Sequence, residues 1–323
     1  VMPGADSSQF RDLLCSLSGV YDFQMKVMYG VVRSIIEKTT DGVSYEGVEE
    51  LKKGKTHVIV SNHRDIVLDP AILQKILADN DVHTTQICVG DNLISSQFIE
   101  DICRTNGMVK VVRGGTPREK FFNSALLSEY LRSRVASNEC SVWIAQRNGR
   151  TKDGADATEQ GLMKMFQMSG SGDFYEDFKE LNILPLSISY QFEPCDFLKA
   201  RELYISRRGQ YVKSPGEDLR SILHGVMQKK GKIHFCFNES ISDEILKSCS
   251  DLNKNERFKE LASRIDAVIN GSYKLWNNNY IAKDILSGKS DYLGCFYTQQ
   301  ERDYFIEYME KGLSAIVDKE PFI

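Results

Sequence analysis

The amino-acid sequence predicts an α/β fold with a central mixed sheet flanked by helices, and with helical additions at both ends. Apolar segments of strand length alternate with helical segments between about residues 42 and 242. Before this region, and again after residue 243, apolar residues recur at helical spacing instead. We therefore expect an N-terminal helical segment over residues 1–42, an α/β core over 43–243 and a C-terminal helical segment over 244–323.

The N-terminal segment is expected to be helical from about Ser8 to Lys38. The apolar residues that recur at helical spacing in it are Phe10, Leu13, Leu14, Leu17, Tyr21, Met28, Val31, Val32, Ile35 and Ile36. Because glycine weakens a helix interior, we expect Gly19 or Gly30 to bend or divide this helix.

The core has the strand and helix pattern of an α/β sheet. The predicted strands lie near residues 57–61, 84–89, 108–113, 141–145, 182–190 and 232–238. The helices between them are expected to start near Asp69, Ser95, Pro117, Thr158 and Gly216, and those of the C-terminal segment to cover 255–269, 275–286 and 299–317. Ligands of open α/β sheets bind at the carboxyl ends of the strands, so the loops there are the expected place for functional residues.

The loop after the first predicted core strand is the most informative segment, and it reads SNHRDIVLDP from Ser61 to Pro70. A polar loop of this kind is seldom needed for packing, because each polar group must find a partner or stay in water. His63 followed by an acidic residue suits a general base and the carboxylate that orients it. The alternative is that Asp69 only caps the next helix, which would start at Pro70, and that His63 is a solvated loop residue.

Two other enzyme classes have sequence patterns that partly overlap those of this chain, and neither pattern is complete. The triplet from His63 to Asp65 matches the start of a kinase catalytic loop, but Pro70 stands where a kinase needs its asparagine, and no glycine-rich loop precedes it. A serine hydrolase would need a Gly-x-Ser-x-Gly turn between a strand and a helix, and the sequence from Gly170 to Gly172 lacks that spacing.

The same loop resembles the first motif of the glycerolipid acyltransferases related to lysophosphatidate acyltransferase, which is usually Asn-His-x-Ser-x-x-Asp and often continues as Leu-Asp-Pro. This chain supplies Asn62, His63 and the Leu-Asp-Pro sequence that contains Asp69. Asp69 follows His63 by six residues instead of five, which one inserted loop residue explains. The resemblance implies that His63 is the general base and Asp69 its partner, with Asp65 as the alternative partner.

Three later segments resemble the other motifs of this family in the same order. The sequence GMVKVVR, which ends at Arg113, is similar to the second motif Gly-x-x-Phe-Ile-x-Arg, with lysine in place of phenylalanine. In VWIAQRNGR, Gly149 and Arg150 match the third motif, a strand followed by Pro-Glu-Gly-Thr-Arg; Asn148 stands near its glutamate and the threonine is missing. The strand ILPLSI resembles the fourth motif, so the four motifs together span residues 58 to 190.

Charge indicates a binding site for an anion in the same region. The whole chain has a net charge of −4, but the segment from Arg104 to Lys152 has ten basic and three acidic residues, a local charge of +7. Arginine forks and backbone N–H groups hold phosphate well. The residues that we expect to bind substrate are Asn62, Arg113, Arg147, Asn148, Gly149, Arg150 and Lys152, whereas Arg118, Lys120, Arg132 and Arg134 are expected to form a solvated helix face.

The resemblance implies an O-acyltransferase of phospholipid biosynthesis that uses acyl-CoA or acyl carrier protein as cosubstrate, a lysophosphatidate-type acceptor, and no cofactor or metal. The alternatives are glycerol 3-phosphate or a non-phosphate lipid as acceptor, or a non-catalytic lipid-binding relative. Eight cysteines without ligand spacing argue against zinc and against a disulfide framework. Nucleic acid is not an expected partner.

The expected location is cytoplasmic, or peripheral on the cytoplasmic face of a membrane. The sequence shows no signal segment and no apolar run near the ~18 residues that span a bilayer. Two stretches are candidates for contact with a membrane surface: the N-terminal helices, and residues 192–213. In the second, the aromatic residues Phe192, Phe197, Tyr204 and Tyr211 lie between Lys199, Arg201, Arg207, Arg208 and Lys213.

Overall fold

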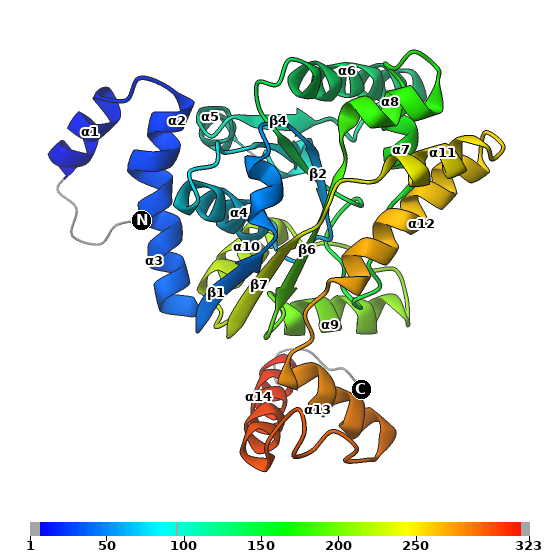
Figure 1. The fold of residues 1–323 in the computed structure, drawn as a ribbon. Helices are drawn as coiled ribbons and strands as arrows, with labels where there is room; N and C mark the ends of the chain where they lie inside the picture. The colour runs from blue at the N-terminus through cyan, green and yellow to red at the C-terminus, as the bar shows by residue number, and fades with distance from the viewer. Residues whose placement is uncertain (1–6, 95, 318–323) are drawn as a thin grey trace.

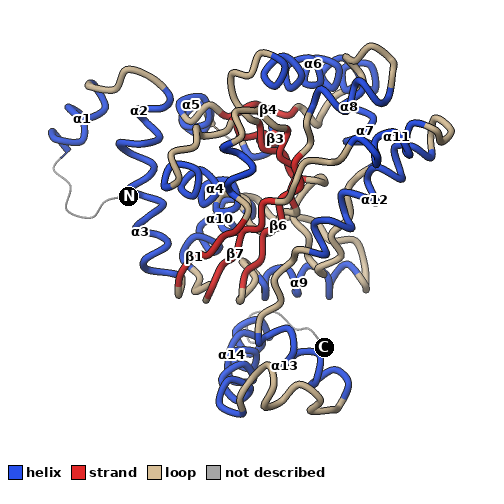
Figure 2. Tube along the Cα trace, in the orientation of Figure 1, coloured by secondary structure: helices blue, strands red, loops and turns tan. Residues whose placement is uncertain are grey.

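The computed structural model describes residues 7–94 and 96–317, and their arrangement is shown in Figures 1 and 2. Ser95, where a helix was expected to begin, lies outside the described residues, as do the outermost parts of both predicted end segments. The helix expected there runs over Gln97–Thr105 (α5), with the Ser96 side chain accepting from the Ile99 backbone N–H. The division into three regions stays a prediction.

The described residues form a seven-stranded sheet in the order β1-β7-β6-β2-β5-β3-β4. The strands are β1 (Gly42–Glu46), β2 (Val58–Ser61), β3 (Gln86–Gly90), β4 (Met108–Val111), β5 (Val142–Ala145), β6 (Leu184–Tyr190) and β7 (Lys232–Phe237). All neighbours pair in parallel except β6 and β7, which are antiparallel. The predicted α/β class with a mixed sheet is therefore confirmed, and the carboxyl ends of β2 to β6 meet at one edge.

Helices cover both faces of the sheet (Figure 1). Before β6, and besides α5, the helices are α1 (Ser7–Cys15), α2 (Val20–Phe23), α3 (Tyr29–Thr39), α4 (Leu68–Asp79), α6 (Pro117–Ala136), α7 (Gln160–Gln167) and α8 (Phe174–Leu181). After β6, the helices are α9 (Asp196–Ser206), α10 (Glu217–Met227), α11 (Asp243–Ser250), α12 (Glu256–Gly271), α13 (Asn277–Ser287) and α14 (Gln299–Val317).

Alternation along β2 divides the core into two layers, because successive strand residues point to opposite faces. Val58 and Val60 pack with apolar residues of α6, α7, α8, α11 and α12. Ile59 packs on the other face with residues of α3 and α4. All three residues are fully buried, so β2 is a central strand that fixes the position of the loop after it.

The N-terminal segment is divided at Gly19, in line with one of the two expected positions, and Gly30 lies within α3. A π-helical turn over Gln24–Met28 joins α2 to α3, a feature that the sequence did not indicate. Short π-helical turns often occur at functional sites. Here the turn places Gln24, Met25 and Met28 in the wall of the larger cavity described below.

The stretch 192–213, a predicted membrane contact, packs in part against the chain itself, and its contact with a membrane stays a prediction. Its middle part forms α9, and α14 packs against that helix. The ring of Phe192 is buried, with its centroid 4.6 Å from that of Tyr308 on α14, and the ring of Phe197 lies 5.2 Å from the same tyrosine. These two aromatic rings are therefore covered by the chain itself. Among the described helices, none has the length and apolarity that would span a membrane.

Candidate active site

His63 lies in the loop after β2, and its imidazole contacts a buried carboxylate. The distance from His63 Nδ1 to Asp69 Oδ2 is 2.9 Å. An ionised carboxylate only accepts hydrogen bonds, so Nδ1 carries the proton and Nε2 keeps a free lone pair. The His63 side chain is 13% exposed, and the residue lines two cavities, so this lone pair is within reach of a bound molecule.

Asp69 is fully buried, and hydrogen bonds hold its carboxylate from several sides. Oδ2 accepts from the backbone N–H of Arg64 at 2.6 Å and of Asp65 at 2.9 Å, and Oδ1 accepts from the Tyr190 hydroxyl at 2.8 Å. Burial, followed by the nearby Asp69 charge, raises the pKa of Tyr190 well above its usual value. Tyr190 therefore stays a hydrogen-bond donor to this carboxylate.

The capping role expected for Asp69 belongs to Asp65, so that expectation was wrong. Helix α4 begins at Leu68, one residue after Val67, and Asp65 Oδ1 accepts from the backbone N–H of both, at 2.7 and 2.9 Å. Asp65 therefore satisfies two backbone N–H groups at the start of α4, and Asp69 faces the imidazole instead. Burial, with Asp69 as the second cause, raises the pKa of Asp65.

Asn62 does not lie where a substrate-binding residue is expected. It is fully buried and does not line either cavity next to His63. Its side-chain amide accepts from the Ile188 N–H at 2.8 Å and donates to the Ile188 carbonyl at 2.9 Å. We assign it a structural role, because it ties the His63 loop to strand β6.

The remaining predicted substrate-binding residues come together around one polar cavity of about 300 Å³ that also contains His63. They are Arg113, Arg147, Asn148, Gly149, Arg150 and Lys152. Gly149 has a φ of +76°, which allows the tight turn that follows β5. Lys152 forms an ion pair with Glu202 of α9, so its charge is partly used within the protein.

The three arginines of this cavity, Arg113, Arg147 and Arg150, are the cations best placed to bind an anion. Among the described residues, none of them has an ion pair with a carboxylate. Nε of Arg147 and Nη1 of Arg150 are buried without a hydrogen-bond partner. A buried N–H group without a partner is costly, so a ligand that accepts hydrogen bonds from these two nitrogens would relieve that cost.

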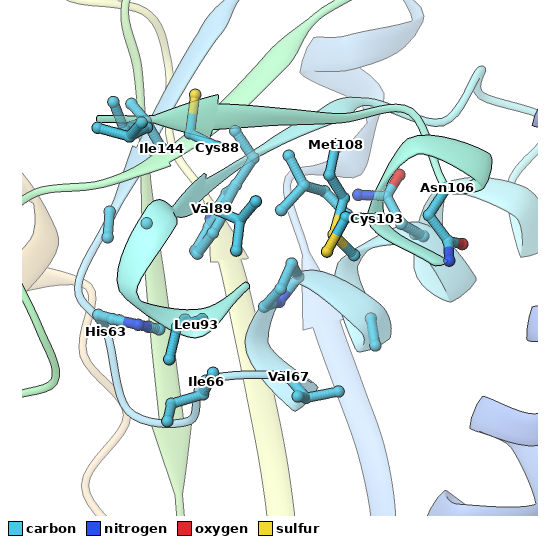
Figure 3. A pocket seen from close by; sticks show the side chains of 18 of the residues that line it. His63, Ile66, Val67, Cys88, Val89, Leu93, Cys103, Asn106, Met108 and Ile144 are labelled. Atoms are coloured by element: carbon cyan, nitrogen blue, oxygen red, sulfur yellow. The ribbon is translucent and has the colours of Figure 1, made fainter. Parts of the chain in front are cut away.

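A second, larger cavity of about 510 Å³ begins at the same histidine and has a mainly apolar lining (Figure 3). In Figure 3, His63 lies on one side of the cavity, and Cys103, Asn106 and Met108 lie on the opposite side. The residues common to both cavities are His63, Ile66, Leu93, Arg113, Arg147 and Asn148. The imidazole therefore lies where an apolar cavity meets a polar one whose three arginines have no carboxylate partner among the described residues, an arrangement that fits an amphiphilic molecule with an anionic head.

Comparison with known proteins gives a family for part of the chain. Residues 42–189 match the family model described as Acyltransferase. This segment belongs to the acyltransferase family. The match confirms the family resemblance that the four motifs indicated. No curated protein sequence matches the chain. A solved structure of the 1-acyl-sn-glycerophosphate (LPA) acyltransferase PlsC from Thermotoga maritima is similar to the chain, with 14% identity over 81% of this chain and 83% of that chain and a TM-score of 0.47.

Several residues that support the site of this acyltransferase segment were not found from the sequence. Trp143 of β5 packs edge-on against the His63 imidazole, with ring centroids 5.8 Å apart, and its indole N–H donates to Ser61 Oγ at 2.9 Å. Tyr190 at the end of β6 bonds to Asp69. Tyr190 is the last residue of β6, at the carboxyl edge of the sheet where ligand sites of α/β folds occur, whereas Trp143 lies within β5 and no signal in the sequence marked it.

Arg64, next to the histidine, joins the two loops of the acyltransferase site. It is buried, and its guanidinium forms an ion pair with the buried carboxylate of Asp156. Asp156 also accepts from the Thr151 hydroxyl, and the Thr151 N–H donates to the His63 carbonyl at 3.1 Å. These contacts hold the His63 loop against the segment that contains Arg147 and Arg150.

Proposed function

We propose that this acyltransferase moves a fatty acyl group from a thioester, acyl-CoA or an acyl carrier protein, to the hydroxyl of a lysophosphatidate-type acceptor. The observation that carries the proposal is the position of the His63–Asp69 pair, at the junction of an apolar cavity and a cavity lined by arginines. A lysophosphatidate has an acyl chain, a free hydroxyl and a phosphate, which are the three groups that this arrangement can receive.

In the proposed reaction, His63 Nε2 accepts the proton of the acceptor hydroxyl while the hydroxyl oxygen forms a bond to the thioester carbonyl carbon. Asp69 fixes the imidazole tautomer and favours the imidazolium that forms, without taking the proton itself. When the tetrahedral intermediate collapses, the carbon–sulfur bond breaks and the imidazolium returns the proton to the leaving thiolate. General base catalysis of this kind typically contributes ~10²- to 10⁴-fold in rate.

The proposed acceptor phosphate binds to Arg113, Arg147 and Arg150, and the acyl chain lies in the apolar cavity. Fixing the phosphate and the chain at two points sets the hydroxyl beside the imidazole, and this positioning lowers the entropic part of the barrier. An acceptor without a phosphate would leave three guanidinium groups without an anion, which favours a phosphate-bearing acceptor.

The proposal is tested with the purified full chain and acyl-CoA or acyl carrier protein as donor. Thioester consumption is measured with lysophosphatidate, with glycerol 3-phosphate and with a lysolipid that lacks phosphate, and the product mass is determined. We expect phosphatidate to form fastest with lysophosphatidate. Turnover with glycerol 3-phosphate alone would assign the first acylation step instead. Lipid binding without thioester consumption by either donor would identify a non-catalytic protein and overturn the proposal.

A further inference from the structure

The start of helix α6 is an exposed tip that the proposed chemistry does not use. This tip covers residues 114–122, all of which are exposed, and reads GGTPREKFF. Phe121 is 69% exposed and Phe122 is 65% exposed. Single exposed apolar residues are ordinary on a protein surface, but two adjacent phenylalanines on a protruding helix start mark an interaction surface more often.

The tip has a defined conformation. The Thr116 hydroxyl accepts from the Glu119 N–H at 3.3 Å, and the Glu119 carboxylate accepts from the Thr116 N–H at 2.7 Å. This reciprocal pair is a capping box, with Pro117 at the start of the helix. The two phenylalanines are therefore presented by a formed helical turn.

The tip borders the two cavities. Arg113, which lines both cavities, comes directly before it, and Ser124 and Leu127 of α6 line the apolar cavity a turn later. On α5, Phe98 is also highly exposed, and its neighbour Ile99 lines the apolar cavity. Exposed aromatic residues on two helices thus lie next to residues of the cavity wall.

The charge of the tip is suited to an anionic surface. Arg118 and Lys120 flank Glu119, whose carboxylate is engaged by Thr116. Among the described residues, neither Arg118 nor Lys120 forms an ion pair. Basic residues next to aromatic rings are the combination that binds the headgroup region of an anionic bilayer.

We propose that the α6 tip docks on an anionic lipid bilayer, with Phe121 and Phe122 in the headgroup region and with Arg118 and Lys120 against lipid phosphates. The choice of a bilayer over a protein partner rests on the continuity with a cavity proposed to take a lipid, and on the unpaired cations beside the rings. Docking in this position places the entrance of both cavities against the surface that supplies the acceptor.

The test is co-sedimentation of the full chain with vesicles of phosphatidylcholine, alone or mixed with phosphatidylglycerol, at low and high salt. We expect binding to the mixed vesicles at low salt and its loss at high salt. The variant F121S/F122S should bind at least about tenfold more weakly, because the apolar contribution is lost. The variant R118Q/K120Q should bind about twenty-five-fold more weakly to mixed vesicles, since each basic residue near an anionic surface contributes about fivefold.

Leu286→Ser is the matched control, because Leu286 is 86% exposed on α13, which lies at the opposite end of the molecule from α6 in Figure 1. It should bind like the wild-type protein. All substituted residues are exposed, and unchanged circular dichroism would confirm that the variants fold. Wild-type protein that stays in the supernatant, or an F121S/F122S variant that binds as tightly as wild type, would overturn the proposal. Vesicle binding without any acyl transfer would leave the docking inference standing and remove only the proposed function.

Discussion

The hydroxyl of Tyr190 donates to Asp69 Oδ1 at 2.8 Å, while His63 Nδ1 contacts the other oxygen of the same carboxylate at 2.9 Å. The two residues that hold this carboxylate come from different elements: His63 from the loop after β2, and Tyr190 from the end of β6. The orientation of the imidazole is therefore coupled to the packing of two neighbouring strands.

Substitution of Tyr190 by phenylalanine should lower kcat more than it raises KM, because a hydrogen bond that orients the carboxylate is lost while the ring is kept. We expect a decrease of about tenfold in kcat and a loss of about 1–3 kcal/mol in the free energy of unfolding. The pH–rate profile should shift as well, which a purely structural defect would not cause. Tyr45→Phe, on the exposed edge strand β1, is the control and should change neither quantity. An unchanged pH profile in Tyr190→Phe would remove the positioning role.

Substitution of His63 by alanine should strongly reduce turnover without unfolding the protein, because the imidazole lines a cavity and is not part of the apolar core. The expected loss in kcat is ~10²- to 10⁴-fold. His83 is exposed, its ring lies tilted against that of Tyr21, and it lines neither cavity, so His83→Ala is the matched control and should keep full activity. Turnover by His63→Ala close to the wild-type rate would refute the proposed mechanism.

Much of the fold could be predicted from the sequence because buried strands such as β2 are short apolar runs between loops. Strand β1 was missed because Gly42–Glu46 is a largely exposed edge strand with little apolar pattern. Helix α9 was missed because its aromatic and basic residues fit a membrane-facing stretch equally well until α14 was seen to cover Phe192. In these two cases the deciding contacts come from residues far along the chain.

The candidate site was predictable to a similar extent and for the same reason. The loops that contain His63 and Arg150 carry their own polar signal, since such residues are rare between a strand and a helix. Whether Asp65 or Asp69 faces the imidazole was not readable, because both lie within six residues of His63 and either could cap α4. The contacts of Asn62 and Tyr190 depend on the register of β2 and β6, which the sequence does not state.

The two acidic residues of the loop should respond differently to the same amide substitution. Asp69→Asn should reduce kcat nearly as much as loss of His63, because the neutral amide no longer favours the imidazolium that forms and has a donor group where the carboxylate has only acceptors. Asp65→Asn should keep most of the activity, since the amide oxygen can still accept from the backbone of Val67 and Leu68. Equal losses of activity in the two variants would contradict the assignment of Asp69 as the partner of His63.

Asp65 should also affect the pH dependence of stability. Burial raises its pKa above the usual value of 3.8 in the folded protein, so the folded state binds its proton more tightly than the unfolded state does. The contribution of this group to stability is therefore present below pH 3.8 and is lost as the pH rises through the raised pKa. The free energy of unfolding is measured with denaturant from about pH 3.5 to about pH 8. It should decrease less over this range in Asp65→Asn than in the wild-type protein. A parallel pH dependence in the two proteins would show that Asp65 does not carry this effect.

Replacement of Arg113 or Arg150 by glutamine should weaken the binding of phosphate-bearing acceptors and leave the binding of other acceptors unchanged. Both guanidinium groups line the polar cavity next to His63 and lack carboxylate partners among the described residues, so their charge is available to a ligand. Loss of one charge-assisted contact costs about 1.5–3 kcal/mol, which corresponds to an increase of roughly tenfold to a hundredfold in KM for lysophosphatidate. The KM of a lysolipid without phosphate should stay the same. Arg104→Gln is the control, because Arg104 is exposed on α5 and pairs with Glu100. An equal rise in KM for both acceptors would mean that these arginines support the loops and do not bind the phosphate.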